Sequence, residues 1–299
     1  MPKIAVFGGT GYLASLIKNQ NNKKKNSYTF FSRKKSNKNY INLSSYKKNL
    51  NIIKDYDFVI HLAGPNQNQI KNNTILQKKK NQITSSICDL CLASDVKMIY
   101  LSSMQVYKDY GMKNISINSK INLKNLYSKS HLESEKIIIK KFLNHKKKFT
   151  ILRMGNVFGF NKLNNKRDIY SNLIHSFCYS ALKKKNIFIN NGSIQRNFIP
   201  SQIFIQVISM IVHKNLFNNS IENIFYKNFN LKEIAYIIKK RLNLLFKLNT
   251  KIVIENFNSK KKLKVYVNRE FKFNFINKKI YFEIDQILKC IKKNSKNYV

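Results

Sequence analysis

A short apolar segment that runs directly into a glycine-rich loop places the strongest constraint on the fold. Residues 4–7 read IAVF, and residues 8–14 read GGTGYLA. A strand that leads through small residues into a helix presents backbone N–H groups at the helix N-terminus, where a pyrophosphate can bind. The spacing is G-x-x-G-x-x-A, not G-x-G-x-x-G, and an ordinary strand–turn–helix also fits it. The loop therefore indicates a dinucleotide site only where β-α-β units surround it.

The first half of the chain supplies that context. Short apolar runs alternate with segments of helical length, which predicts repeated βα units and a doubly wound parallel sheet of the α/β class. We expect strands at residues 4–7, 28–31, 58–62, 98–101 and 149–152. Residues 1–160 should form the dinucleotide-binding domain, rejoined by about 186–200, with most of 161–299 in a smaller α/β lobe. In that lobe we expect helices at 231–245 and 284–291 and strand-like segments at 251–254 and 264–267.

The charge of the chain raises a different possibility. A formal net charge of +42 attracts polyanions whatever the fold. The lysine triplets, such as 78–80 and 183–185, are scattered between apolar segments, and the wealth of Lys, Asn, Ile and Phe matches A/T-rich codons. We therefore expect a solvated surface and no specific nucleic-acid site. A nucleic-acid binder stays the weaker alternative.

Other simple features bound the class of protein. No apolar run approaches the roughly 20 residues of a membrane span, and the first one is too short for a signal peptide. These features predict a cytoplasmic protein of 299 residues. Cys88 and Cys91 have C-x-x-C spacing within a helical segment, while Cys178 and Cys290 stand alone. We expect reduced packing thiols and no metal, with a zinc or redox pair as the alternative.

Three further segments hold polar residues at places where a parallel sheet binds ligands. Residues 57–64 (DFVIHLAG) predict a buried strand that ends in small residues, with His61 in the core. The strand that begins at residue 98 brings Ser103 to the same edge of the sheet. A helix then opens at Tyr127 and runs to about residue 143. Tyr127 and His131 are four residues apart, so both share a helical face that can reach the cleft beside Ser103.

Taken together, these segments resemble the extended short-chain dehydrogenase/reductase family, the NAD-dependent nucleotide-sugar epimerases and dehydratases. The resemblance covers roughly residues 3–245, and six matches in order are far more specific than one. It implies a Rossmann-type sheet and a smaller C-terminal substrate lobe. The segments are GGTGYLA (cofactor loop), DFVIHLAG (fourth strand), LSSMQVY (serine strand), YSKSHLESE (the Y-x-x-x-K helix), LRMGNVFG (sixth strand) and NGSIQRNFIP (the G-x-x-x-R-D-F segment).

The resemblance implies an oxidoreductase or isomerase in which a tyrosine moves the proton. Tyr127 would be the acid/base and Ser103 would bind the same sugar oxygen. Lowering a tyrosine pKa from about 10 to 7 requires roughly 4 kcal/mol, which in the family comes partly from a lysine. His131 stands at that lysine position, and an imidazole is largely neutral at pH 7. A slower enzyme, an enzyme with His131 as relay or cofactor clamp, and a non-catalytic NADP-binding regulatory or scaffold protein all remain open.

Cofactor contacts follow from the same resemblance. Arg33 lies where an acidic residue would mark NAD, so NADP is slightly favoured over NAD. The residues implied to bind the cofactor are Gly8, Thr10, Gly11, Tyr12, Leu13, Arg33, Leu62, Ala63 and His131.

The resemblance also implies that Ser103, Asn156 and Arg196 bind the substrate, the last two at the diphosphate of a nucleotide sugar. Sugar dehydratases of the family carry an Asp-Glu pair where this chain has residues 104–105 (MQ), so 4-epimerisation or keto-sugar reduction is favoured over dehydration. Neutral residues also replace family acids at Asn42, Asn197 and Gln202. A homodimer and a role in polysaccharide biosynthesis are implied by the resemblance alone.

Overall fold

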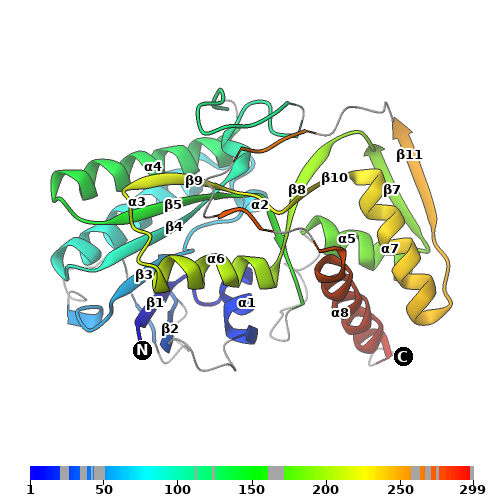
Figure 1. Cartoon of the computed structure of the whole chain (residues 1–299), viewed down its shortest axis with the longest axis horizontal. Helices are drawn as coiled ribbons and strands as arrows, with labels where there is room; N and C mark the ends of the chain where they lie inside the picture. Colours follow the sequence, from blue (N-terminus) through cyan, green and yellow to red (C-terminus); the bar gives the residue numbers. More distant parts are fainter. Residues whose placement is uncertain are drawn as a thin grey trace. The chain divides into compact units, whose positions relative to one another are not determined.

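The computed structural model describes residues 1–20, 27–33, 39–41, 43, 51–111, 113–122, 125–160, 172–256, 263–266, 271–273 and 276–296. The chain forms two compact units, shown in Figure 1. The first unit contains Met1–Lys108, Ile117–Met154 and Gln206–Ile224. The second contains Asp109–Ser116, Gly155–Ile205 and Phe225–Val299.

A parallel six-stranded sheet of order β2-β1-β3-β4-β5-β9 forms the centre of the first unit. All five strands expected from the apolar runs are present, with bounds that differ by a few residues. The central strands are buried on both faces, as parallel strands between helical layers are. The strands are β1 (Lys3–Phe7), β2 (Ser27–Phe31), β3 (Phe58–His61), β4 (Lys97–Ser103), β5 (Phe149–Met154) and β9 (Ser220–Ile224).

The order of the strands fixes where the helices lie. From β1 the chain moves one way to β2, then returns past β1 to β3, β4 and β5. Because such crossovers are right-handed, α1 (Tyr12–Gln20) covers one face of the sheet, and α3 (Thr74–Ala93) and α4 (Leu126–Asn144) cover the other. Helices α3 and α4 pack against each other (Figure 1). This is the predicted doubly wound fold, and its switch point lies between β1 and β3, next to the glycine loop.

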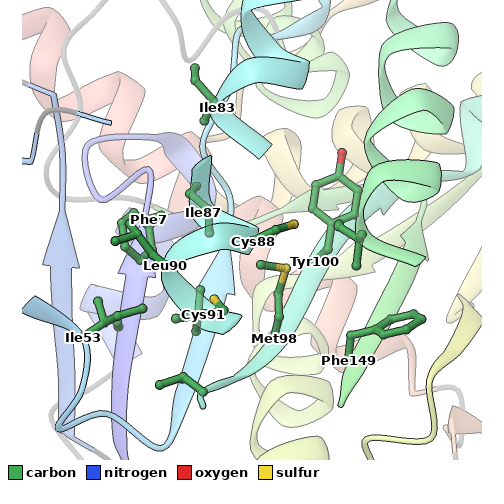
Figure 2. Packing of buried hydrophobic residues seen from close by; sticks show 14 of the residues in the cluster. Phe7, Ile53, Ile83, Ile87, Cys88, Leu90, Cys91, Met98, Tyr100 and Phe149 are labelled. Atoms are coloured by element: carbon green, nitrogen blue, oxygen red, sulfur yellow. The ribbon is translucent and has the colours of Figure 1, made fainter. Parts of the chain in front are cut away.

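The C-x-x-C pair belongs to the core beneath α3. Cys88 and Cys91 are fully buried among side chains from α3 and the sheet, including Phe7 and Met98 (Figure 2). Burial raises the pKa of the Cys88 thiol to about 12 and that of Cys91 well above its usual range. Both cysteines are free, as packing thiols should be. Within the described ranges, no group of three or more His, Cys, Asp or Glu side chains could hold a metal ion.

Among the described residues, the second unit contains two small sheets and the helices α5, α7 and α8, and α6 begins in it and continues into the first. One sheet has the order β10-β8-β6, in which β8 pairs antiparallel with β10 and parallel with β6; the other joins β11 to β7 in parallel. The elements of the second unit are β6 (Asn156–Phe158), α5 (Leu173–Tyr179), a π-helical turn (Ser180–Lys184), β7 (Asn186–Asn191), β8 (Gln195–Pro200), α6 (Ser201–His213), β10 (Lys227–Asn230), α7 (Leu231–Phe246), β11 (Lys251–Asn256) and α8 (Asn277–Lys296). The short helix α2 (Gln67–Ile70) belongs to the first unit.

The boundary after Met154 lies near the expected one at residue 160, but the segment that returns to the first unit is not the expected 186–200. Residues 186–200 lie in the second unit, whereas Gln206–Ile224 returns to the first and adds β9 to the edge of the sheet beside β5. Strand β9 reads SIENI and is only partly buried, so no apolar run marks it in the sequence. Of residues 264–267, Val265 forms one isolated bridge with Ile115, and Val267 lies outside the described residues, as does Asn42. Helix α8 is longer than expected. None of the described helices combines the length and apolar character that a bilayer span requires.

Candidate active site

The glycine loop is tightly packed at the carboxyl ends of the strands. Gly8 has φ +91°, and a Cβ atom there would lie 2.8 Å from the backbone of Leu62 and Ala63. A Cβ atom on Gly9 would lie 2.8 Å from the Cβ of Phe30. The Gly11 N–H donates to the Gly8 carbonyl at 2.8 Å, and α1 begins at the next residue. A side chain is therefore excluded where a pyrophosphate would approach the helix N-terminus, and the loop fits a dinucleotide.

The other residues expected at the cofactor lie around this loop. Leu62 and Ala63 follow β3 and are partly buried, as are Tyr12 and Leu13 in the first turn of α1. Thr10 is exposed, and Arg33 is exposed two residues beyond the end of β2. Their contacts with a cofactor remain predictions.

Ser103 and Tyr127 meet, as their positions in the sequence predict. Ser103 ends β4, and its side chain hydrogen-bonds to the Tyr127 hydroxyl. The start of α4 is fixed by Asn125, whose side chain accepts from the Tyr127 N–H at 2.9 Å, and by Ser128, whose hydroxyl donates to the Gln105 carbonyl at 2.7 Å. Burial raises the pKa of Tyr127 to about 12, and the hydrogen bond from Ser103 opposes this shift. Two hydroxyls thus stand together at the edge of the sheet that carries the glycine loop.

His131 lies one turn after Tyr127 and is buried. The two rings meet edge to face, with centroids 4.6 Å apart and an interplanar angle of 79°. The Nδ1 atom of His131 shares a hydrogen bond of 2.9 Å with the Tyr100 hydroxyl, which leaves Nε2 as the remaining polar atom of the ring. Burial lowers the pKa of His131 well below its usual range, and the charges of Lys80 and His61 lower it further. The imidazole is therefore neutral at pH 7 and is not a cation beside Tyr127.

His61 is a core histidine, as predicted. It is fully buried in β3, and its Nδ1 atom accepts from the Ala63 N–H at 3.2 Å. In a neutral ring the proton must then be on Nε2, which donates to the Thr84 hydroxyl at 3.0 Å. Burial lowers the pKa of His61 to about 3, with a further contribution from Lys80. This histidine is not placed to act on a substrate.

A buried ion pair that the sequence does not reveal anchors α4 to the sheet. Arg153 of β5 donates to both carboxylate oxygens of Glu135 in α4, at 3.0 and 2.6 Å. Ser102 donates to the same carboxylate at 2.5 Å, and Arg153 also donates to the Tyr107 hydroxyl at 3.0 Å. Tyr107 in turn donates to Asn223 of β9 at 2.7 Å. The network ties α4, and with it Tyr127, to β4, β5 and β9.

A second charged residue that sequence reasoning missed is Lys80. The triplet 78–80 was expected to be solvated, and Lys78 and Lys79 are exposed, but Lys80 is only 3% exposed. Its Nζ atom lies over the ring of Tyr127, 5.1 Å from the ring centroid. The helical period could have shown this, because residue 80 shares a face with the buried Ile83 and Ile87.

Arg196 and Asn156 belong to the second unit. The Arg196 guanidinium lies over the Tyr110 ring at 5.3 Å and donates to the backbone carbonyls of Gln195 (3.2 Å) and Tyr110 (3.4 Å). Gly111, at φ +84°, makes room for it, since a Cβ atom there would lie 2.2 Å from the guanidinium. Asn156 donates to the Asn197 carbonyl at 3.4 Å. Both side chains are partly buried, and their contact with a substrate remains a prediction.

Comparison with known proteins shows the family to which the chain belongs. The family described as NAD dependent epimerase/dehydratase matches residues 4–223. A search of curated proteins gives no significant sequence match.

Solved structures share the fold along the whole chain. UDP-N-acetylglucosamine 4-epimerase from Bacillus cereus is 18% identical with a TM-score of 0.76, covering 98% of this chain and 100% of that one. RMD from Pseudomonas aeruginosa, complexed with NADPH, is 14% identical with a TM-score of 0.76 and the same coverage. WbmH from Bordetella bronchiseptica, in complex with NAD+, is 13% identical with a TM-score of 0.75, covering 98% and 99%. The match over most of the chain shows that this protein belongs to the NAD-dependent epimerase/dehydratase family.

Proposed function

We propose that the protein is an NAD(P)-dependent enzyme that acts on a nucleotide-activated sugar, by 4-epimerisation or by reduction of a keto group. The observation that carries the proposal is the pair of hydroxyls of Ser103 and Tyr127, which hydrogen-bond to each other at the edge of the sheet that bears the glycine loop. Similar folds include a UDP-N-acetylglucosamine 4-epimerase and proteins complexed with NADPH or NAD+.

The residues of the first unit fit a nicotinamide dinucleotide. The loop at Gly8 and Gly11 would hold its pyrophosphate, and Leu62 and Ala63 would line the crevice at the switch point. Arg33 would pair with a 2′-phosphate, which slightly favours NADP. When bound, such a cofactor would supply or accept a hydride at the sugar carbon.

Tyr127 would move the proton that accompanies this hydride. With a pKa of about 12 it is protonated at neutral pH, so it is ready to donate its O–H proton to a keto oxygen held by Ser103. The opposite direction needs the phenolate, which at pH 7 would cost about 7 kcal/mol without further stabilisation. The same phenolate forms when Tyr127 gives up its proton in the reduction, so both directions need a positive charge that stabilises it.

The residues after Ser103 argue against dehydration. Elimination of water needs an additional acid and base, and Met104 and Gln105 cannot titrate. On the substrate side, Arg196 presents a planar guanidinium suited to a diphosphate, and Asn156 would assist it. We also propose that the protein is a cytoplasmic homodimer that works in polysaccharide synthesis.

A non-catalytic NADP-binding regulatory or scaffold protein is the second candidate. The observation that favours it is the neutral, tethered His131 at the position of the lysine on which the family depends. Such a protein would bind cofactor and leave sugars unchanged.

Calorimetry with NADPH and NADH, followed by NADPH oxidation with a panel of 4-keto nucleotide sugars, separates the two. We expect wild type and Tyr127→Phe to bind NADPH with similar affinity and only wild type to turn over. Arg33→Asp should weaken NADPH and spare NADH, since it removes the partner of a 2′-phosphate. Binding of cofactor with no turnover on any sugar, and no C4 epimer of a UDP-hexose detected by NMR, would favour the regulatory protein.

A further inference from the structure

The side chain of Lys80 is held beside Tyr127 by the packing of α3 and by Gly64. Helix α3 is fixed to α4 on both sides of this residue, because Gln77 and Asn81 both donate to Glu133, at 2.9 and 2.5 Å. The side chain of Lys80 then runs past Gly64, where a Cβ atom would lie 3.2 Å from its Cγ atom and 3.4 Å from its Cδ atom. Gly64 has φ +152°, a conformation that further disfavours any side chain. Helix packing and a glycine thus direct the ammonium toward Tyr127.

The titratable groups around Lys80 come from β3, β4 and α4. His61 of β3 and His131 of α4 both feel its charge, and both are neutral because burial lowers their pKa values. Glu135 of α4 interacts with Lys80 while being paired to Arg153, and Tyr100 of β4 contacts both histidines. Tyr127 of α4 presents the face of its ring to Nζ at 5.1 Å from the centroid.

We propose that Lys80, reaching in from α3, supplies the positive charge beside Tyr127 that a lysine at position 131 would otherwise supply from α4. When Tyr127 gives its proton to the keto oxygen, the negative charge left on the phenolate is stabilised by the ammonium over its ring. Lys80 is a positioning residue, since it acts through Tyr127. This role rests on the proposed function, but the coupling of the two residues can be measured without it.

The ionisation of the two groups is mutually supportive. Burial lowers the pKa of the Lys80 ammonium well below its usual range, and the Glu135 carboxylate opposes that shift. Burial raises the pKa of Tyr127. A phenolate at Tyr127 favours the ammonium form of Lys80, and the ammonium favours the phenolate, so loss of either charge weakens the other.

Tyrosine ionisation in the free protein tests the proposal. In protein labelled with 13C at the tyrosine Cζ, the resonance of Tyr127 is identified by its absence in Tyr127→Phe. Its titration midpoint is obtained by fitting the part of the titration curve that lies between pH 7 and 12. We expect Lys80→Met to raise the titration midpoint of Tyr127 by about one pKa unit or more. The matched control Lys79→Met, one residue away on the exposed face, should leave the midpoint unchanged. An unchanged midpoint in a folded Lys80→Met protein would overturn the proposal.

Lys80→Arg separates charge from packing. It keeps a cation on a long side chain, so the Tyr127 midpoint should stay closer to wild type than in Lys80→Met. A midpoint raised equally in both variants would mean that packing, not charge, controls Tyr127, and the proposal would fail. Lys80→Gln replaces Lys80→Met if the latter does not fold.

The two proposals fail separately. A Lys80-dependent midpoint in a protein that turns over no sugar would refute the proposed function and keep the Lys80–Tyr127 coupling. Turnover by wild type, with a Tyr127 midpoint that is the same in wild type and in Lys80→Met, would refute the coupling alone.

Discussion

The imidazole of His131 is bound through Nδ1 to the Tyr100 hydroxyl at 2.9 Å, with its ring 4.6 Å from that of Tyr127. A histidine held in this way is a neutral packing partner for Tyr127. In our proposal, Lys80 of helix α3 supplies the positive charge that the lysine of a Y-x-x-x-K pattern would supply. The pattern of spacing along one helix therefore does not describe how the charges of this site are arranged.

Removing the Tyr127 hydroxyl should abolish most turnover and spare the fold. We expect Tyr127→Phe to lower kcat for NADPH-dependent reduction of a 4-keto nucleotide sugar by a factor of about 10²–10⁴, because the proton donor is lost. Ser103→Ala should cost about 10², because one hydrogen bond to the developing oxyanion is lost. Tyr236→Phe, at an exposed tyrosine, is the matched control. Full activity in Tyr127→Phe would exclude Tyr127 as the acid.

Acid should destabilise the protein through His61. Its pKa is about 3 when folded and about 6.5 when unfolded, so the unfolded state binds more protons between these values and stability falls as pH drops below about 6.5. The contribution lost by pH 4.5 is about 3 kcal/mol. Urea unfolding at pH 7 and 4.5 should show that His61→Gln removes about this much of the acid sensitivity. His213→Gln, at an exposed histidine, should leave the sensitivity as in wild type. Equal sensitivity in His61→Gln would contradict the buried neutral state.

The buried pair of Arg153 and Glu135 should behave as a unit. Arg153→Met leaves the Glu135 carboxylate buried without its cation, so the free energy of unfolding should fall by about 3–5 kcal/mol. The double variant Arg153→Met/Glu135→Gln should recover much of that loss. Lys147→Gln removes a surface pair with Asp95 and should cost less than about 1 kcal/mol. If the double variant is less stable than the single one, an unpaired charge is not the cause.

Gly111 should control the position of Arg196. Gly111→Ala places a methyl group against the guanidinium, so it should weaken binding of UDP, used as a diphosphate probe, by about tenfold, much as Arg196→Met does. Calorimetry measures both. Lys113→Ala, on an exposed side chain of the same loop, is the control. Normal UDP binding by Gly111→Ala, alongside weak binding by Arg196→Met, would show that Arg196 adopts another position in the complex.

The sequence predicts those helices and strands that are encoded by patterns among neighbouring residues. The strands of the central sheet follow from apolar runs, and α4 with its shared face for Tyr127 and His131 follows from spacing. The position of Ser103 follows from the rule that the carboxyl ends of parallel strands lie at one edge of the sheet, and the first turn of α4 brings Tyr127 to it.

Features that depend on distant partners could not be predicted in this way. In a chain with 56 Lys and Arg residues, a single lysine carries little information, so the sequence predicts a surface position for Lys80 as for its neighbours. Nothing local pairs Arg153 with Glu135, since the contact joins a strand to a helix. Strand β9 lacks an apolar run, because it lies at the edge of the sheet and pairs with β5 alone.

The return of residues 206–224 makes the first unit discontinuous in sequence. A fragment of residues 1–160 would keep the glycine loop, Ser103 and Tyr127, yet it would lack β9, and the apolar edge of β5 would stand open. Open edges of this kind recruit strands from other molecules, so the fragment should aggregate. Asn223, the acceptor for Tyr107, would be lost with it. Residues 206–224, which contain none of the candidate site residues, thus decide whether the part of the chain with Ser103 and Tyr127 can be made soluble by itself.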